Sequence, residues 1–169
     1  MDARSESEPT TTKNRTTVER RSEREIVITR TINGPARLVF EAWTNAELFK
    51  EWWLPKSVGL SLRSCELDVR VGGTYRLVFG GDAANGMAFF GRYLEVVPHA
   101  RIVWTNDEAG EDGAVTTVTF AETGGQTRVV LHERYPSKEA LDASLGAYDG
   151  MSETLDQLEQ FVVTLGRTR

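Results

Sequence analysis

The sequence predicts an α+β domain in which a seven-stranded, curved antiparallel sheet wraps around one long C-terminal helix. Two short helical patterns, at 35–44 and 45–53, follow the first strand and carry three of the four tryptophans. Residues 60–135 then show almost only strand and turn patterns, and residues 137–165 form one amphipathic helical pattern. A sheet wrapped around a helix readily leaves a cavity, so we expect a binding site for an apolar molecule between them.

The first residues have a different composition from the rest of the chain. Residues 1–22 are polar, and Ala3 and Val18 are their only aliphatic residues. Such a segment cannot bury enough apolar surface to offset the entropy lost on ordering. We therefore expect a disordered polar tail over 1–22 and a single domain over 23–169, since a chain of this length suits one well-buried domain.

Composition and charge exclude several classes of protein. The chain is 40% hydrophobic and 27% charged, which is ordinary for a globular protein. Its formal charge of −5 argues against a nucleic-acid-binding or anionic-membrane surface. No apolar run approaches the roughly 18 residues that span a bilayer, and the N-terminus lacks the apolar core of a signal peptide. We expect a cytoplasmic protein that neither binds nucleic acid nor inserts into membranes.

Cysteine and histidine are scarce. Cys65 is the single cysteine, which excludes an internal disulfide and fits a reducing compartment. His99 and His132 are the only histidines, so a multi-histidine metal site is not expected. The chain also has no Walker-type glycine loop and no nucleophile motif with a partner base. We therefore predict no metal and no cofactor.

The first ordered segment begins near Glu25. In EIVITRTIN, at 25–33, every second residue from Ile26 onward builds one largely apolar face, which predicts a strand. Pro35 follows and suits the first position of a helix over 35–44. Thr44 with Glu47 matches a capping box, which predicts a second short helix that Pro55 ends.

Six further strand patterns follow, separated by turn signals. Glycine pairs at 72–73, 80–81 and 124–125 lie between these patterns and are interpreted as turns rather than phosphate-binding loops. Consecutive hairpin connections favour antiparallel pairing. The predicted strands cover residues 61–71, 74–79, 86–97, 101–107, 114–122 and 127–135.

The last pattern predicts one helix of about seven turns. Ser137 follows Pro136 and is expected to cap its N-terminus. Apolar residues then recur at three- and four-residue spacing and form one stripe. These residues are Leu141, Leu145, Tyr148, Met151, Leu155, Leu158, Val162 and Leu165.

Five segments carry a resemblance to a known family. They are PARLVFEAWT at 35–44, LFKEWWLP at 48–55, LDVRVGGTY at 67–75, GRYLEVVP at 91–98 and RIVWT at 101–105. With these segments in this order, the chain resembles the family of Hsp90 ATPase activator homologues, within the START-like or SRPBCC superfamily, over roughly residues 25–165. The resemblance implies a helix-grip (START-like) fold. Where family members often have Gly-Trp, this chain has Gly150-Met151, which predicts a more adaptable cavity wall.

Candidate ligand-binding residues come from each part of the predicted cavity. Trp52 and Trp53 are adjacent on a helix and must diverge by about 100°, so one is expected in the core and the other at the cavity mouth. Plain core packing is the competing interpretation for every aromatic. The predicted cavity residues are Phe40, Trp43, Trp53, Leu67, Tyr75, Leu77, Phe89, Trp104, His132, Met151 and Leu155.

The last predicted strand has two faces that periodicity does not distinguish. Leu131 and Glu133 share one face with Val129, whereas His132 and Arg134 share the other. An inward His132 would be a polar anchor in an apolar cavity, and an outward His132 would be a surface residue.

Three functions are consistent with the sequence. The preferred one is binding of a small hydrophobic or aromatic molecule in the cavity. The alternatives are a cavity enzyme of the polyketide cyclase or hydrolase type, and a chaperone-interacting protein as the family name implies. For chemistry, His132, Glu133, Tyr93 and Tyr148 are the plausible proton donors and acceptors, and no spacing marks them as a catalytic set.

Overall fold

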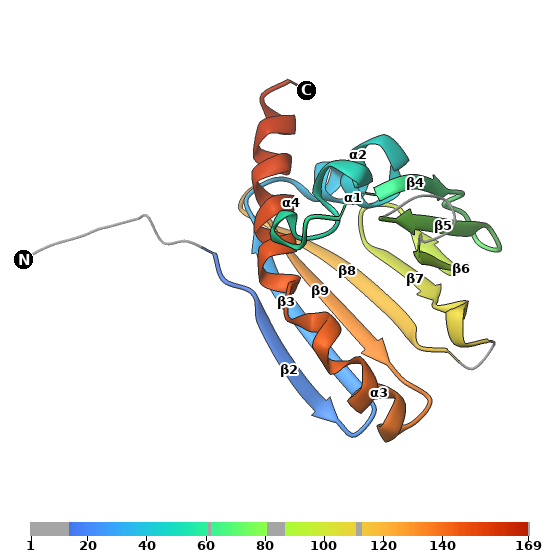
Figure 1. Ribbon diagram of the computed structural model, residues 1–169. Helices are drawn as coiled ribbons and strands as arrows, with labels where there is room; N and C mark the ends of the chain where they lie inside the picture. Colours follow the sequence, from blue (N-terminus) through green and yellow to red (C-terminus); the bar gives the residue numbers. More distant parts are fainter. Residues whose placement is uncertain (1–13, 61, 81–86, 111–112, 169) are drawn as a thin grey trace, which may run out of the picture.

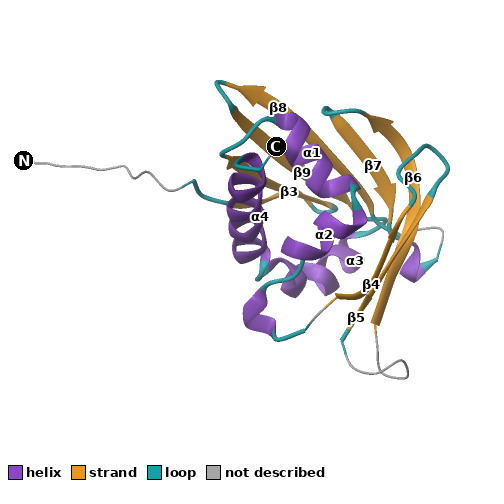
Figure 2. Ribbon diagram, turned by 90° about the horizontal axis from the view of Figure 1, so that it is seen from above, coloured by secondary structure: helices purple, strands orange, loops and turns teal. Residues whose placement is uncertain are grey.

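The computed structural model describes residues 14–60, 62–80, 87–110 and 113–168, and the strands of this part form one eight-stranded antiparallel sheet (Figure 1). Seen from above, the sheet curves around the helices, which lie on its concave side (Figure 2). The spatial order is β2-β3-β9-β8-β7-β6-β5-β4. The strands are β2 (Thr17–Ser22), β3 (Glu25–Ile32), β4 (Leu62–Leu67), β5 (Thr74–Phe79), β6 (Met87–Val97), β7 (Arg101–Thr105), β8 (Val115–Thr123) and β9 (Gln126–Arg134).

The helices confirm the predicted class, a sheet around a C-terminal helix with two short helices after the first predicted strand. The final helix, α4, contacts β3 and both short helices, and α1 also contacts β8 and β9. The α-helices are α1 (Ala36–Thr44), α2 (Ala46–Trp52), α3 (Lys138–Ser144) and α4 (Met151–Gly166), and 3-10 helices cover Lys56–Val58, Asp107–Ala109 and Leu145–Tyr148.

The prediction of seven strands and a disordered tail over 1–22 is wrong for residues 17–22. These residues form β2, an exposed edge strand that pairs with β3. A strand held by backbone hydrogen bonds at a sheet edge needs no buried side chain, so composition does not reveal it. Polar contacts also hold the segment, because Asn14 donates to Glu159 at 2.7 Å and Arg20 lies 2.7 Å from Asp142. Residues 1–13 of the predicted tail lie outside the described residues.

The C-terminal helix is interrupted, whereas one continuous helix was predicted. Ser137 caps α3 as expected, since its hydroxyl accepts a hydrogen bond from the Ala140 amide at 3.1 Å. A 3-10 segment then precedes α4, in a stretch that contains Gly146 and Gly150, and glycine has low helix propensity. The apolar stripe is buried on both sides of the break, at Leu141 and Leu155, whereas Leu145 within the 3-10 segment is exposed.

The boundary between the short helices differs slightly from the prediction. Asn45, rather than Thr44, caps α2, because its side chain accepts hydrogen bonds from the amides of Glu47 and Leu48. Thr44 instead donates its hydroxyl to the Phe40 carbonyl within α1. Asn and Thr both serve as N-caps, so the pattern alone placed this boundary one residue early.

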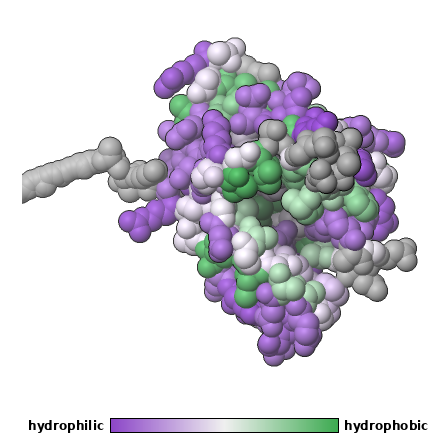
Figure 3. Space-filling view, in the orientation of Figure 1, coloured by the Kyte–Doolittle hydropathy of each residue, from purple (hydrophilic) through white to green (hydrophobic). Residues whose placement is uncertain are grey.

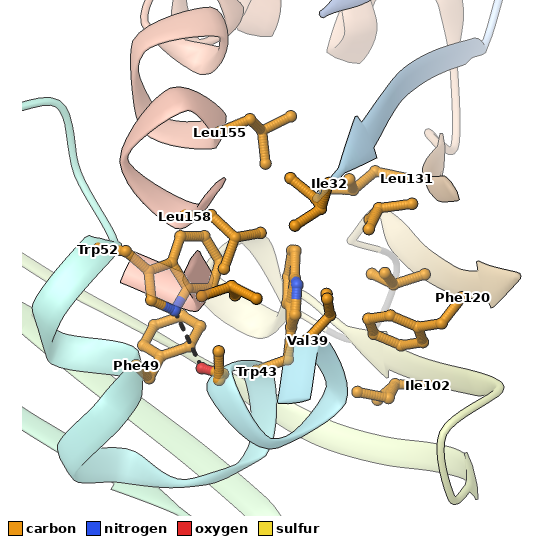
Figure 4. Packing of buried hydrophobic residues seen from close by; sticks show 14 of the residues in the cluster. Ile32, Val39, Trp43, Phe49, Trp52, Ile102, Phe120, Leu131, Leu155 and Leu158 are labelled. Atoms are coloured by element: carbon orange, nitrogen blue, oxygen red, sulfur yellow. Dashed lines mark hydrogen bonds between the residues drawn. The ribbon is translucent and has the colours of Figure 1, made fainter. Parts of the chain in front are cut away.

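The adjacent tryptophans separate as expected. Trp52 is fully buried, and its indole nitrogen donates to the Ala42 carbonyl at 3.0 Å. Figure 4 shows this bond and, in the same cluster, the Trp43 ring and the α4 residues Leu155 and Leu158. Trp53 is half-buried. The core therefore joins the short helices to α4 and leaves Trp53 at its margin.

Candidate functional site

A cavity of about 640 Å³ lies between the sheet and the segment that joins β9 to α4. Figure 3 shows the protein in the orientation of Figure 1, with a hollow near the middle that hydrophobic residues border. Its sheet wall comes from β3, β5, β6, β7 and β9, and Asn106 and Glu108, at the 3-10 helix Asp107–Ala109, also line it. The lining residues are Ile28, Trp53, Leu54, Pro55, Tyr75, Leu77, Phe79, Phe89, Trp104, Asn106, Glu108, Gly113, Ala114, Leu131, Glu133, Tyr135, Pro136, Ala140, Ser144, Ala147, Tyr148, Gly150, Met151 and Thr154.

The structure brings six of the predicted residues together at this cavity. They come from all three predicted sources, namely the short helices, the sheet and the final helix. Whether a ligand touches them stays a prediction. The six residues are Trp53, Tyr75, Leu77, Phe89, Trp104 and Met151.

The other five predicted residues lie outside the cavity lining. Trp43 and Leu155 are buried in the core, which is the competing interpretation of an apolar pattern. Phe40 packs edge-on against His99 and Phe120, at 5.5 Å between ring centroids in each case. Leu67, at the end of β4, is half-buried against the core and does not reach the cavity.

His132 points away from the cavity, so it is not the polar anchor considered above. Its Nε2 lies 2.9 Å from a carboxylate oxygen of Glu25. The hydrogen bond from His132 holds the pKa of the Glu25 carboxyl below its ordinary value. Leu131 and Glu133, its neighbours on β9, line the cavity instead. The polar residue that β9 presents inward is therefore Glu133.

Neutral hydroxyl groups hold the Glu133 carboxylate. Thr116 donates to one carboxylate oxygen at 2.6 Å, and Tyr148 donates to the other. The Tyr135 and Tyr148 hydroxyl oxygens are 2.5 Å apart. Because the Tyr148 proton is directed to Glu133, Tyr135 must donate to Tyr148. In this cluster, Tyr135 thus donates its hydrogen bond to Tyr148, and Tyr148 donates to the Glu133 carboxylate.

Asn106, just past the end of β7, extends the cluster across the sheet toward β5. Its amide nitrogen donates to Thr116 at 3.0 Å and to the Ala114 carbonyl at 2.9 Å. Tyr75 donates its hydroxyl to the Thr105 carbonyl at 2.8 Å and lies 3.3 Å from the Asn106 side-chain oxygen. A continuous set of hydrogen bonds therefore surrounds the polar end of the cavity.

Burial changes the acidity of the groups at this end. It raises the pKa of the Tyr148 hydroxyl well above its ordinary value, and the adjacent Glu133 charge raises it further. Burial also raises the pKa of Tyr135 and Tyr75. The Glu108 carboxyl, which accepts a hydrogen bond from the Phe90 amide at 2.8 Å, has a pKa raised chiefly by burial. The tyrosines thus stay neutral hydrogen-bond donors near neutral pH.

Sequence reasoning named Glu133 and Tyr148 only as isolated donors, and it missed their partners. Thr116 and Glu133 are directly paired across β8 and β9, a register that the sequence does not specify. Asn106 and Tyr135 lie just past the ends of their strands, where no periodicity applies. An inward carboxylate on a strand beside buried Leu131 and Val129 was the one available signal.

Two features are absent from the described part of the chain. No group of three or more His, Cys, Asp or Glu side chains there is close enough to hold a metal ion. No helix among the described residues is long and apolar enough to cross a membrane.

Comparison with known proteins agrees with the fold and the motifs. The family model described as Activator of Hsp90 ATPase homolog 1-like protein matches residues 33–163. The chain belongs to this family. The match covers both short helices, β4 through β9 and most of α4, so it includes every residue of the cavity lining except Ile28 in β3. The sequence matches none of the curated proteins with which it was compared.

Solved structures that are similar to this chain show the same architecture. A Chromobacterium violaceum protein is 30% identical, with a TM-score of 0.69, over 83% of this chain and 98% of that one. A Nitrosomonas europaea protein is 24% identical, with a TM-score of 0.75, over 86% and 98% of the two chains. An AHSA1-like protein from Aeromonas hydrophila is 21% identical, with a TM-score of 0.65, over 83% and 94%. The last two similarities show the fold alone.

Proposed function

We propose that this protein binds a small hydrophobic or aromatic molecule in the cavity between the sheet and the C-terminal helices. The observation that carries the proposal is the lining itself. Aromatic and aliphatic side chains form most of it, and the polar groups gather around Glu133 at one end. Ligand sites combine apolar walls with a few convergent polar groups in this way.

The cavity volume fits this function. About 640 Å³ falls within the range of roughly 300–1,000 Å³ that is usual for small-molecule sites. Met151, on the first turn of α4, occupies one wall and is a flexible, polarisable side chain. We therefore expect the site to accept ligands of two or three fused rings.

The indole N–H signals of the tryptophans provide a direct test. N-Phenyl-1-naphthylamine, an apolar aromatic probe, should shift the signals of Trp53 and Trp104, which line the cavity. The Trp52 signal should stay in place because its N–H is hydrogen-bonded in the core. A well-dispersed spectrum in which neither Trp53 nor Trp104 moves for any apolar probe would refute the proposal.

A matched pair of variants separates the cavity from the surface. Met151→Trp should fill part of the cavity and weaken binding of the probe by about tenfold or more. Leu94→Trp, on the exposed face of β6, should leave the affinity unchanged. Equal affinities in both variants would place the probe elsewhere on the protein.

A cavity enzyme of the cyclase or hydrolase type is the second candidate. Glu133 favours it, because a carboxylate that accepts from Tyr148 at a cavity is placed to act as a general base. Turnover of a bound ligand that Glu133→Gln abolishes without loss of binding would establish this function. Binding without turnover would instead support ligand binding as the function.

The cellular setting and the protein partners remain predictions from the sequence. A cytoplasmic protein with a formal charge of −5 suits small-molecule binding and not nucleic-acid binding. The family description names an activator of Hsp90 ATPase, so a chaperone of that type is the first protein partner to test if ligands fail to bind.

A further inference from the structure

We infer that the cavity selects organic cations, namely amines on an aromatic or apolar skeleton, whose ammonium group pairs with Glu133. The inference rests on the proposed function and names the chemical class of its ligand. It is carried by the charges of the lining, the direction of its hydrogen bonds and the aromatic rings beside Glu133.

The lining contains negative groups without positive ones. Glu133 and Glu108 both face the cavity, and its described lining residues include no Lys, Arg or His. Among the ion pairs of the described residues, none involves Glu133. A half-buried carboxylate held only by neutral hydroxyls is poorly compensated, because a buried charge is stabilised best by an opposite charge. A ligand ammonium would supply the missing partner.

The hydrogen bonds around Glu133 leave acceptor capacity and no spare donor. Thr116 and Tyr148 each direct their single hydroxyl proton to the carboxylate, and Tyr135 directs its proton to Tyr148. An ionised carboxylate has about four acceptor positions, of which these bonds use two. The ligand group that meets this end must therefore donate hydrogen bonds. A ligand carboxylate would meet only acceptors and a like charge.

An aromatic ring lies two strands away from the same carboxylate, on the same face of the sheet. Glu133 pairs with Thr116, and Thr116 pairs with Trp104, so the three residues form one row on the inner face of β9, β8 and β7. Adjacent strands lie about 4.8 Å apart, which places Trp104 about 10 Å from Glu133 along this row. Tyr75 adjoins Trp104, with 6.2 Å between their ring centroids.

This spacing suits an ammonium ion. A cation between Glu133 and Trp104 reaches the carboxylate on one side and the face of an electron-rich ring on the other. The aromatic skeleton of the ligand then lies against Leu77, Phe89 and Met151 in the apolar part of the cavity. A neutral alcohol satisfies the requirement for a donor and gains neither the ion pair nor the full cation–π attraction.

Three ligands with one skeleton test the inference at neutral pH. They are 2-naphthylmethylamine, 2-naphthalenemethanol and 2-naphthoic acid, and affinity is measured by calorimetry together with the Trp53 and Trp104 indole signals. We expect the amine to bind about tenfold more tightly than the alcohol, and the acid to bind most weakly. In Glu133→Gln the amine should lose this advantage and bind within about threefold of the alcohol.

Control variants keep the result specific. Tyr148→Phe removes a donor and keeps the Glu133 charge, so the preference for the amine should persist. Glu51→Gln, on the exposed side of α2, should behave as the native protein. Thermal unfolding of each variant checks that it is folded before affinities are compared.

The outcomes separate the inference from the proposed function. Equal binding of the three ligands, or tightest binding of the acid, would overturn the inference and leave cavity binding intact. A preference for the amine that survives Glu133→Gln would also overturn it. If none of the three binds, and N-phenyl-1-naphthylamine also leaves Trp53 and Trp104 unmoved, both fail together.

Discussion

The guanidinium group of Arg30, in β3, lies 2.6 Å from a carboxylate oxygen of Glu159, in α4. Another of its nitrogens lies 2.6 Å from Asp156, and only 2% of the Arg30 surface is exposed. Glu159 also accepts a hydrogen bond from the Asn33 amide at 2.7 Å. These contacts fix the position of α4 on β3. They therefore also fix the wall of the cavity that α4 forms.

Arg30→Met should therefore be strongly destabilising. The change leaves the neighbouring carboxylates of Asp156 and Glu159 without the cation that they share. Breaking a buried ion pair from one side costs about 3–5 kcal/mol, and the partial exposure of Asp156 favours the lower end. Urea unfolding, followed by far-ultraviolet circular dichroism, measures the free energy of unfolding.

Arg128→Met is the matched control for this prediction. Arg128 is exposed on β9, so its replacement should change the free energy of unfolding by less than about 0.5 kcal/mol. If Arg30→Met and Arg128→Met unfolded at the same urea concentration, the ion pairs of Arg30 would not stabilise the fold.

The order of elements was predictable because each element satisfies a local rule. Alternation from Ile26 to Ile32 marks β3, and glycine pairs mark hairpins between the later strands. β2 was not predictable, since its side chains are polar and backbone pairing alone places it beside β3. The break in the last helix was also missed, because the apolar stripe runs through Gly146 and Gly150 without interruption.

The site was less predictable than the fold, because it depends on which face of each strand turns inward. Trp53 and Met151 followed from helix periodicity and reach the cavity. On β9, a shift of one residue exchanges His132 for Glu133, and alternation cannot distinguish the two faces. The packing of Val129 and Leu131 in the core fixes the orientation.

Gly150 is placed where a larger residue does not fit. A Cβ atom added there would lie 2.5 Å from Cγ of Pro55, and both residues line the cavity. Gly150→Ala should push the start of α4 away from Pro55 and lower the free energy of unfolding by about 1–3 kcal/mol. Chemical denaturation measures the loss.

Gly146→Ala is the control for Gly150→Ala, since a Cβ atom at Gly146 would meet nothing within 4 Å. The control should be neutral or slightly stabilising, because alanine restricts the unfolded chain more than glycine does. An equal loss of stability at both positions would show that the close contact with Pro55 is not the cause.

Cys65 should react slowly with thiol reagents. Burial raises the pKa of its thiol to about 11, with Glu47 and Glu66 adding to the effect and Lys50 opposing it. The thiolate is the reactive form, so at pH 8 labelling should be about a hundredfold slower than for an ordinary thiol of pKa ~8.5. The rate should rise with pH, and urea-unfolded protein should react at the ordinary rate. Fast labelling of the folded protein at pH 8 would contradict the prediction.

The tyrosines should resist ionisation until the protein unfolds. Burial raises the pKa of Tyr75, Tyr93, Tyr135 and Tyr148, which are all four tyrosines of the chain. Above about pH 10 the unfolded chain loses tyrosine protons that the folded protein retains. The stabilising contribution is therefore complete below about pH 10 and decreases as the pH rises, by about 1.4 kcal/mol per pH unit for each such tyrosine.

An alkaline titration from about pH 9 to about pH 12 checks that the folded protein loses stability as the pH rises. Tyrosinate absorbance and far-ultraviolet circular dichroism, recorded on the same sample, should change together, because ionisation requires unfolding. Urea-unfolded protein should titrate smoothly near pH 10 as the reference. If all four tyrosines ionised near pH 10 while the circular dichroism stayed native, the hydroxyls around Glu133 would be open to solvent. The hydrogen-bonded cluster that we assign to the polar end of the cavity would then be absent in solution.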